Sequence, residues 1–110
     1  MLPKTRISTE EAFRRLTIGE PSSSESLRAL VRPLDARTDA LLRIGALVAI
    51  DAPVSSYRSV VEAALRSGAQ LDDLLAVLVA VAGTVGTARI VSAAPRLALA
   101  AGYDVEAALE

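Results

Sequence analysis

Residues 51–68, DAPVSSYRSVVEAALRSG, lie between two strongly apolar segments, and the rest of the chain is organised around them. Apolar residues recur at helical spacing from Val54 to Leu65, while serines and charged residues fall on another side. Gly68 stands where glycine commonly ends a helix, because glycine adopts the left-handed conformation without strain. The stretch therefore predicts an amphipathic helix with a polar start.

The segment before this stretch, LDARTDALLRIGALVAI, predicts a helix from about residue 35 to residue 50. Asp35 is a suitable N-cap, and Asp39 and Arg43 are spaced to pair on the outer side. The inner side of this helix is a stripe of four small or apolar residues: Leu41, Ile44, Gly45 and Val48.

The segment after it, from Leu74 to Ala88, contains no charged residue. It is shorter than the roughly 18 apolar residues expected of a membrane span, so it predicts a helix buried on nearly all sides. A single domain of 110 residues can bury few of its helices on every side. The apolar excess therefore predicts a subunit interface.

At the N-terminal end, residues 1–7 are expected to form a loose arm. Ser8 with Glu11 fits a capping box for a helix over residues 8–17, and Ser22 with Glu25 fits a second one. This second helix should close at Pro33, because a residue before proline is disfavoured in helical conformation.

At the C-terminal end, residues 89–101 are expected to be helical, with Pro95 causing a kink or a fresh start after Ser92. Residues 103–110 are expected to form a short helix or a tail. The predicted organisation is an arm with short helices over residues 1–33, a helical domain over residues 34–102, and that tail.

Composition agrees with an all-α domain of about six helices, because hydrophobic residues make up 52% of the chain and aromatic residues only 3%. A net charge of -1 makes nucleic acid an unsuitable partner. The chain has no Cys and no His, which excludes disulfides, thiol chemistry and imidazole catalysis. We expect no cofactor and no metal, and the N-terminus lacks the apolar core of a secretory signal, which favours a cytoplasmic protein.

The order of these signals resembles the carboxymuconolactone decarboxylase and alkyl hydroperoxidase D-like family. The matching features are the start at Leu34 and Asp35, the ALRSG ending at Gly68, the acidic pair Asp72 and Asp73, and a late glycine. That glycine is residue 86, and the likeness covers about residues 34–100. The resemblance implies a helical domain that assembles into trimers or hexamers, with its site at the start of the central helix near a subunit interface.

The resemblance also implies which groups are missing. The peroxidase branch carries Cys-x-x-Cys-x-x-x-His with a Glu on the preceding helix. The His falls on Val60, the second Cys on Ser56, the first on Pro53 or Ala52, and the Glu near Ala40. A hydroxyl cannot replace a thiolate in disulfide exchange, so Cys-dependent peroxidase activity is excluded. The decarboxylase branch uses a His near the same helix start, which is absent too.

The polar start of the central helix is still a candidate site for a small carboxylate, because free amides at a helix start favour an anion. The candidate ligand-binding residues are Ser55, Ser56, Tyr57, Arg58, Ser59 and Arg43. Alternatively, the serines satisfy helix-start amides, Arg58 faces water, and Arg43 pairs with Asp39.

Two functions therefore stand open. The first is a homo-oligomer without redox activity that binds a small molecule or serves as a scaffold. The second is a cofactor-free decarboxylase or isomerase acting on a small carboxylate or lactone, with Arg58 or Arg43 holding the substrate and Tyr57 or a serine moving a proton. A cavity at Ser55–Ser59 with two or more ionisable groups would favour the enzyme.

Overall fold

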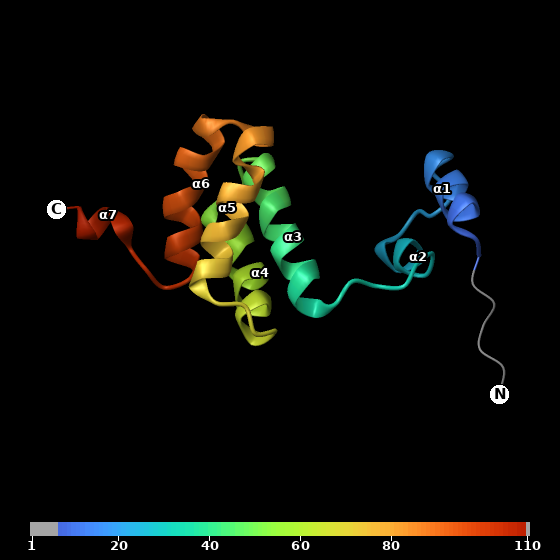
Figure 1. Ribbon diagram of the computed structural model, residues 1–110, viewed down its shortest axis with the longest axis horizontal. Coiled ribbons are helices and arrows are strands. Elements are labelled where there is room, and N and C mark those ends of the chain that lie inside the picture. The colour runs from blue at the N-terminus through green and yellow to red at the C-terminus, as the bar shows by residue number, and fades with distance from the viewer. Residues whose placement is uncertain (1–6, 110) are drawn as a thin grey trace. The chain divides into compact units, whose positions relative to one another are not determined.

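The computed structural model describes residues 7–109, and in that part of the chain all regular structure is helical, in seven helices (Figure 1). The prediction of an all-α protein is therefore confirmed. The chain divides into two units, Met1–Leu34 and Asp35–Glu110, which are described separately. The predicted arm over residues 1–7 lies almost wholly outside the described residues.

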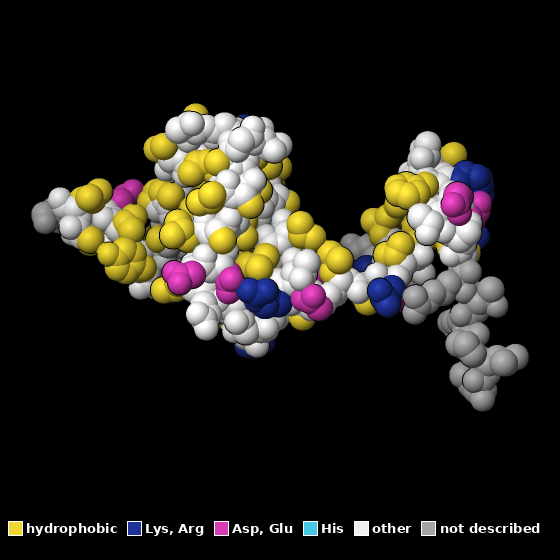
Figure 2. Space-filling view, viewed as in Figure 1, with side chains coloured by type: hydrophobic (Ala, Val, Ile, Leu, Met, Phe, Trp, Pro, Cys, Tyr) yellow, Lys and Arg dark blue, Asp and Glu magenta, His cyan; other side chains and the backbone are white. Residues whose placement is uncertain are grey.

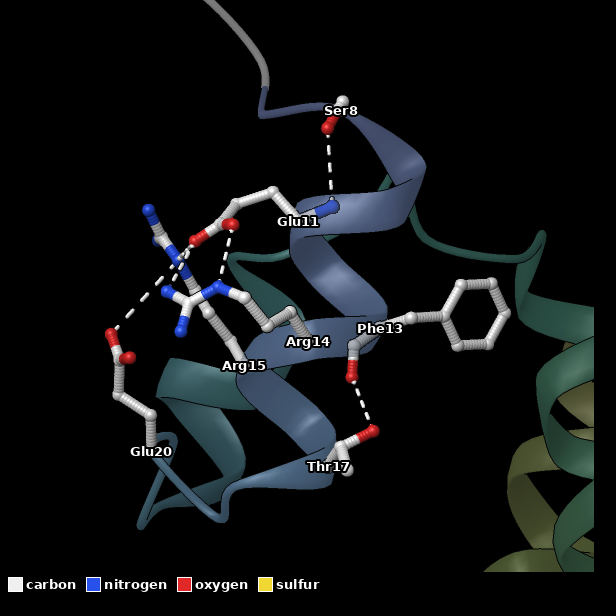
Figure 3. A network of polar contacts seen from close by, with 7 residues as sticks. All are labelled: Ser8, Glu11, Phe13, Arg14, Arg15, Thr17 and Glu20. Atoms are coloured by element: carbon white, nitrogen blue, oxygen red, sulfur yellow. Dashed lines mark hydrogen bonds and ion pairs between the residues drawn. The ribbon is translucent and has the colours of Figure 1, made fainter.

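In the N-terminal unit, α1 spans Thr9–Thr17, and the Ser8 hydroxyl accepts a hydrogen bond from the Glu11 amide at 3.1 Å. This half of the predicted capping box is confirmed. The Glu11 carboxylate does not reach back toward Ser8. It accepts hydrogen bonds from Arg14 and Arg15 at 2.7 and 3.1 Å instead, as Figure 3 shows, because charged donors lie one turn along the helix.

The second helix, α2, spans Ser24–Arg28, and its N-cap is Ser23, whose hydroxyl accepts from the amide three residues on at 3.0 Å. The prediction of a start at Ser22 with Glu25 is wrong by one residue. The prediction that the helix runs to Pro33 is also wrong. No residue of α2 is buried, so packing adds nothing to extend so short a helix.

The second unit holds five helices: α3 (Ala36–Ala49), α4 (Val54–Arg66), α5 (Leu71–Val85), α6 (Thr87–Ala100) and α7 (Val105–Ala108). Helix α3 packs on α4 and α5, and α6 packs on the same two helices. The result is a four-helix bundle in which α3 and α6 also touch across the diagonal (Figure 1). The short α7 follows α6 and contacts it.

The core lies inside this bundle and contains aliphatic residues and one tyrosine. Its largest fully buried side chains are Ile44, Val48, Tyr57 and Val61. Helices α3 and α5 approach closely at Gly45, where an added Cβ atom would lie 3.3 Å from a Val81 methyl group. A glycine at this point thus permits the contact between the two helices.

Several local predictions for the bundle are confirmed. Asp35 caps α3 by accepting from the Thr38 amide at 2.8 Å, and the predicted inner stripe of α3 is buried at Ile44 and Val48. Helix α4 ends before Gly68, which has a φ of +97°. Local capping and helical periodicity therefore located both helices correctly.

The prediction for the two following helices needs correction. Helix α5 begins at Leu71 and ends at Val85 rather than running to Ala88, because Gly86 adopts a φ of +89° and breaks the helix. Helix α6 is continuous through Pro95, so the prediction of a fresh start after Ser92 is wrong. Pro95 has no backbone N–H to donate to the Val91 carbonyl. Val91 is solvent-exposed, so water can donate to that carbonyl in place of the missing amide.

Within one chain, helix α5 is buried on one side only, so the burial on nearly all sides that the sequence predicts would need a subunit interface. Leu74 and Leu78 face the core, whereas Leu71, Leu75 and Val79 are 58%, 60% and 71% exposed. Hydrophobic side chains accordingly gather over this part of the bundle in Figure 2. A four-helix bundle can cover only one face of each helix, so this second apolar face is left uncovered.

In the part of the chain that the structure describes, no helix combines the length and the apolar character needed to cross a membrane.

Candidate functional site

The start of α4 is built by a tight turn after α3. Asp51 is in the turn with a φ of +56°, Ala52 is buried, and Pro53 occupies the N-cap position. No side chain caps the first amides of α4. The alternative in which the serines satisfy the amides of this helix start is therefore wrong, and the Ser56 amide donates to the Pro53 carbonyl instead.

Tyr57 is the one candidate residue that the fold draws fully into the core, with 0% of its surface exposed. Its hydroxyl is also buried and has no hydrogen-bond partner among residues 7–109. Burial raises the pKa of this phenol, and the nearby Asp51 carboxylate raises that pKa further while the Arg96 guanidinium opposes both. Tyr57 is therefore protonated at neutral pH, and its hydroxyl is a donor without an acceptor.

The other candidate residues do not converge on Tyr57. Ser55, Arg58 and Ser59 are exposed, and Ser56 is half-buried. Arg43 forms an ion pair with Asp39 at 3.0 Å on the outer side of α3, as the simpler alternative predicted. Spacing of four residues was enough to find this pair.

A polar cluster that the sequence did not reveal joins the turn at Asp51 to α6. The Ser92 hydroxyl donates to Asp51 Oδ1 at 2.8 Å, and Arg96 Nη1 lies 3.2 Å from the same oxygen. Arg89 Nη1 is 3.4 Å from Asp51 Oδ2. The Ser92 hydrogen bond, helped by the two arginine charges and opposed by desolvation, holds the pKa of Asp51 below its usual value.

Arg96 does more in this cluster than pair with a carboxylate. Its Nη1 also donates to the backbone carbonyls of Asp51 and Ala52, at 3.3 and 3.0 Å. One guanidinium nitrogen thus holds the turn before α4 in place. The partners are more than 40 residues apart in the chain, so neither helical periodicity nor spacing could have identified them.

The positions that the family resemblance assigns to catalysis carry no thiol, imidazole or carboxylate. Ala40 and Ala52 are buried at 3% and 4% exposure, and Ser56 and Val60 are half-buried one turn apart on α4. Ser56 is the only one of the four with a side-chain donor or acceptor. Among residues 7–109, no side chain forms a hydrogen bond with the Ser56 hydroxyl, so no base is in place to activate it as a nucleophile.

An open cavity of about 450 Å³ lies beside the start of α4, lined by Val54, by residues of α6, and by Asp104 and Glu106 at the start of α7. Its ionisable lining residues are Arg96, Asp104 and Glu106. None of the residues Ser55–Ser59 lines it. The ionisable groups that the enzyme hypothesis required are therefore present near the helix start, but on residues other than those predicted from the sequence.

Two further hollows are apolar. One of about 420 Å³ lies between α3 and α5 and includes Leu42 and Val81, and one of about 250 Å³ lies between α5 and α6 and includes Leu75 and Tyr103. Among residues 7–109, no three His, Cys, Asp or Glu side chains are grouped so that they could hold a metal ion.

Comparison with known proteins adds no relative to this description: no family model, curated protein sequence or solved structure matches the chain. The chemistry of the site therefore has to be argued from its own groups. The groups that line the cavity are the Arg96 guanidinium, the Ser92 hydroxyl and the carboxylates of Asp104 and Glu106, while the Tyr57 phenol is buried outside that lining. They can bind charged groups and donate hydrogen bonds, and the described cavity lining contains no thiol or imidazole.

Proposed function

We propose that this chain is a homo-oligomeric protein of the carboxymuconolactone decarboxylase-like type, without redox activity, that binds a small molecule or serves as an assembly scaffold. Cytoplasmic location and assembly as a trimer or hexamer belong to the same proposal. The family assignment is supported by the order of sequence signals from Leu34 to about residue 100, in which the helix starts and ends fall at Asp35, Gly68 and Gly86.

The observation that carries the proposal is the uncovered apolar face of α5. Leu71, Leu75 and Val79 are spaced by four residues and so lie one above another on the same side of the helix. Leu42 on the neighbouring α3 is also 58% exposed, beside the apolar hollow between α3 and α5. Contiguous apolar surface of this kind is typical of a subunit interface.

Light scattering after size exclusion tests the assembly. We expect the full chain at micromolar concentration to be a trimer or hexamer, and the double variant Leu75→Glu/Val79→Glu to be a monomer, because two buried charges would lack partners at the interface. A matched control, Ser22→Glu/Ser24→Glu, adds the same charge at exposed positions and should leave the assembly unchanged. A wild-type chain that stays monomeric contradicts the proposal.

The second candidate function is a cofactor-free decarboxylase or isomerase. One observation favours it: Arg96 lies at the cavity by the start of α4 and acts electrostatically on the buried Tyr57 phenol. It is the weaker candidate, because the raised pKa of Tyr57 makes the phenol a poor base at neutral pH. Conversion of a small lactone carboxylate that is abolished by Tyr57→Phe would favour this alternative over the binding protein.

The absence of redox function has its own test. We expect no peroxide turnover with a dithiol reductant, because the chain has no cysteine to form the required thiolate. Turnover above that of a heat-denatured sample of the same preparation would overturn this part of the proposal.

A further inference from the structure

The cavity beside the start of α4 has opposite charges on its lining that do not neutralise one another. Arg96 lines it from α6, and Asp104 and Glu106 line it from the segment that contains α7. Among residues 7–109, no ion pair joins Arg96 to either carboxylate, although all three side chains border the same space. The cavity, of about 450 Å³, has a size typical of small-molecule sites.

The positive side of the cavity is held in place before any ligand arrives. Arg96 Nη1 is bound to Asp51 and to the Ala52 carbonyl, which ties the side chain to the turn before α4. Nε and Nη2 of Arg96 donate to no other described residue. Because a guanidinium offers five N–H donors in a planar fork, the remaining donors suit a carboxylate.

The negative side has acceptors to spare. Asp104 Oδ1 accepts one hydrogen bond, from the Ala107 amide, while the Glu106 side chain makes no hydrogen bond or ion pair with another described residue. Carboxylate oxygens in this state suit an ammonium group. The rest of the lining consists of the polar Ser92 and four apolar residues: Val54, Val91, Pro95 and Leu99.

We propose that this cavity binds a small molecule with an ammonium group at one end and a carboxylate at the other, joined by a short apolar chain. The carboxylate lies on Arg96, the ammonium group lies on Glu106 and Asp104, and the methylene groups contact the aliphatic lining. The inference rests on the small-molecule-binding part of the proposed function and names the chemical class of the ligand.

Three probes of matched length test the proposal: 6-aminohexanoate, hexanoate and hexylamine. They are titrated into the full chain at neutral pH and followed by two-dimensional amide NMR. We expect 6-aminohexanoate to bind about tenfold more tightly than either single-charge probe, because each lost charged hydrogen bond costs about that factor. The shifted amides should include those of Ser92, Arg96 and Glu106.

A variant pair separates the site from a general charge effect. Glu106→Gln should lower the affinity for 6-aminohexanoate toward that for hexanoate, because only Asp104 is left to hold the ammonium group. Glu62→Gln, which alters an exposed pair with Arg66 of α4, should leave the affinity unchanged. Arg96→Gln should bring the affinity down to that of hexylamine. Arg96 also holds the turn before α4, so circular dichroism must show that the Arg96→Gln variant is folded. If it is not folded, the result for Glu106→Gln decides the test.

Three results would each overturn the inference: equal affinity for the three probes, no binding tighter than about 10 mM, or an unchanged affinity in Glu106→Gln. Light scattering on the same samples keeps the two proposals apart. An intact oligomer that binds no 6-aminohexanoate overturns the ligand class and leaves the proposed assembly standing. A monomer that binds the probe overturns the assembly and supports the ligand class.

Discussion

Helices α1 and α3 begin in the same way, with Ser8 and Asp35 each accepting a hydrogen bond from the amide three residues on. Beyond that shared start the two regions differ. Among the described residues of the N-terminal unit only Ala12 is buried, whereas α3 alone buries four residues in the bundle core. Caps and ion pairs thus determine where a helix begins, while buried apolar area makes the helix part of a cooperatively folded unit.

The same contrast appears in the charged groups of the two regions. In the N-terminal unit the ion pairs of Glu11 join residues three and four apart on one helix. The bundle has local pairs as well, such as that of Arg43 with Asp39, but it also has ion pairs between different elements: Arg37 lies 2.8 Å from Asp73 and Arg96 lies 3.2 Å from Asp51. Local pairs therefore support a single helix, and the long-range pairs hold the bundle's turns and helix starts to their neighbours.

The largest effect should come from removing core volume. Ile44→Ala is expected to lower the free energy of unfolding of the bundle by about 2–5 kcal/mol, because Ile44 is fully buried and a cavity remains. Phe13→Ala, at a residue 66% exposed in α1, should change it by no more than about 0.5 kcal/mol. Urea unfolding followed by circular dichroism measures both, and equal losses would contradict the comparison.

A smaller effect of opposite sign is expected at the buried phenol. Tyr57→Phe should raise the free energy of unfolding by about 1 kcal/mol, because the Tyr57 hydroxyl is buried without a partner and the variant keeps the ring. Tyr103→Phe, at an exposed tyrosine, is the matched control and should leave stability unchanged. Destabilisation by Tyr57→Phe would mean that a bound water or ligand accepts from the hydroxyl.

The two N-caps should separate the regions again. Asp35→Ala is expected to lower the free energy of unfolding of the whole bundle by about 1 kcal/mol, since α3 packs on three other helices. Ser8→Ala removes a similar bond but should only increase amide hydrogen exchange within α1. A loss of bundle stability in Ser8→Ala would show that α1 is part of the same cooperative unit.

The smallest effect is the pH dependence of exposed carboxylates. The pKa of Asp51 is lowered in the fold, so its contribution to stability is complete above the ordinary Asp range and is lost as the pH falls through the lowered value. Asp51→Asn should therefore reduce the acid sensitivity of bundle unfolding. Asparagine is chosen because it tolerates the positive φ at this position.

The pKa of Glu11 provides the contrasting measurement in the N-terminal unit. Side-chain hydrogen bonds from Arg14 and Arg15 lower it to about 2, so this carboxylate should stay ionised to lower pH than an isolated glutamate. Because the pKa is lower in the folded state, the stabilising effect of the Glu11 carboxylate is lost only as the pH falls through that value. It should appear as fraying of α1 and not as a change in bundle unfolding. Carboxyl NMR titration checks it, and an ordinary glutamate value would contradict the ion pairs.

Much of the fold was predictable, because its determinants are local. Helical periodicity predicted the buried sides of α3 and α4. Asp35 indicated the start of α3, and Gly68 indicated the end of α4. Errors occurred where local signals were ambiguous. The prediction placed the N-cap of α2 at Ser22, whereas the neighbouring Ser23 caps it, and Pro95 proved compatible with a continuous α6.

The candidate site was far less predictable. The helix start at Val54 and the pair of Asp39 with Arg43 followed from spacing. Of the other candidate residues, Ser55, Arg58 and Ser59 proved to be exposed and Ser56 half-buried, so they do not form one site. The cluster that does border the helix start joins Asp51 to residues of α6. Such partners are set by how the helices pack, and no pattern within a few residues encodes that.

By itself, the sequence determined the helices, their apolar sides and the absence of thiol and imidazole chemistry, because these depend on residue type and on spacing along a single helix. Only the tertiary structure decided that Tyr57 is buried without an acceptor, that Arg96 holds the turn before α4, and that α5 keeps a second apolar face uncovered. Each of these depends on which helices become neighbours. That choice follows from the packing of the whole bundle, and its contacts join residues far apart in the chain.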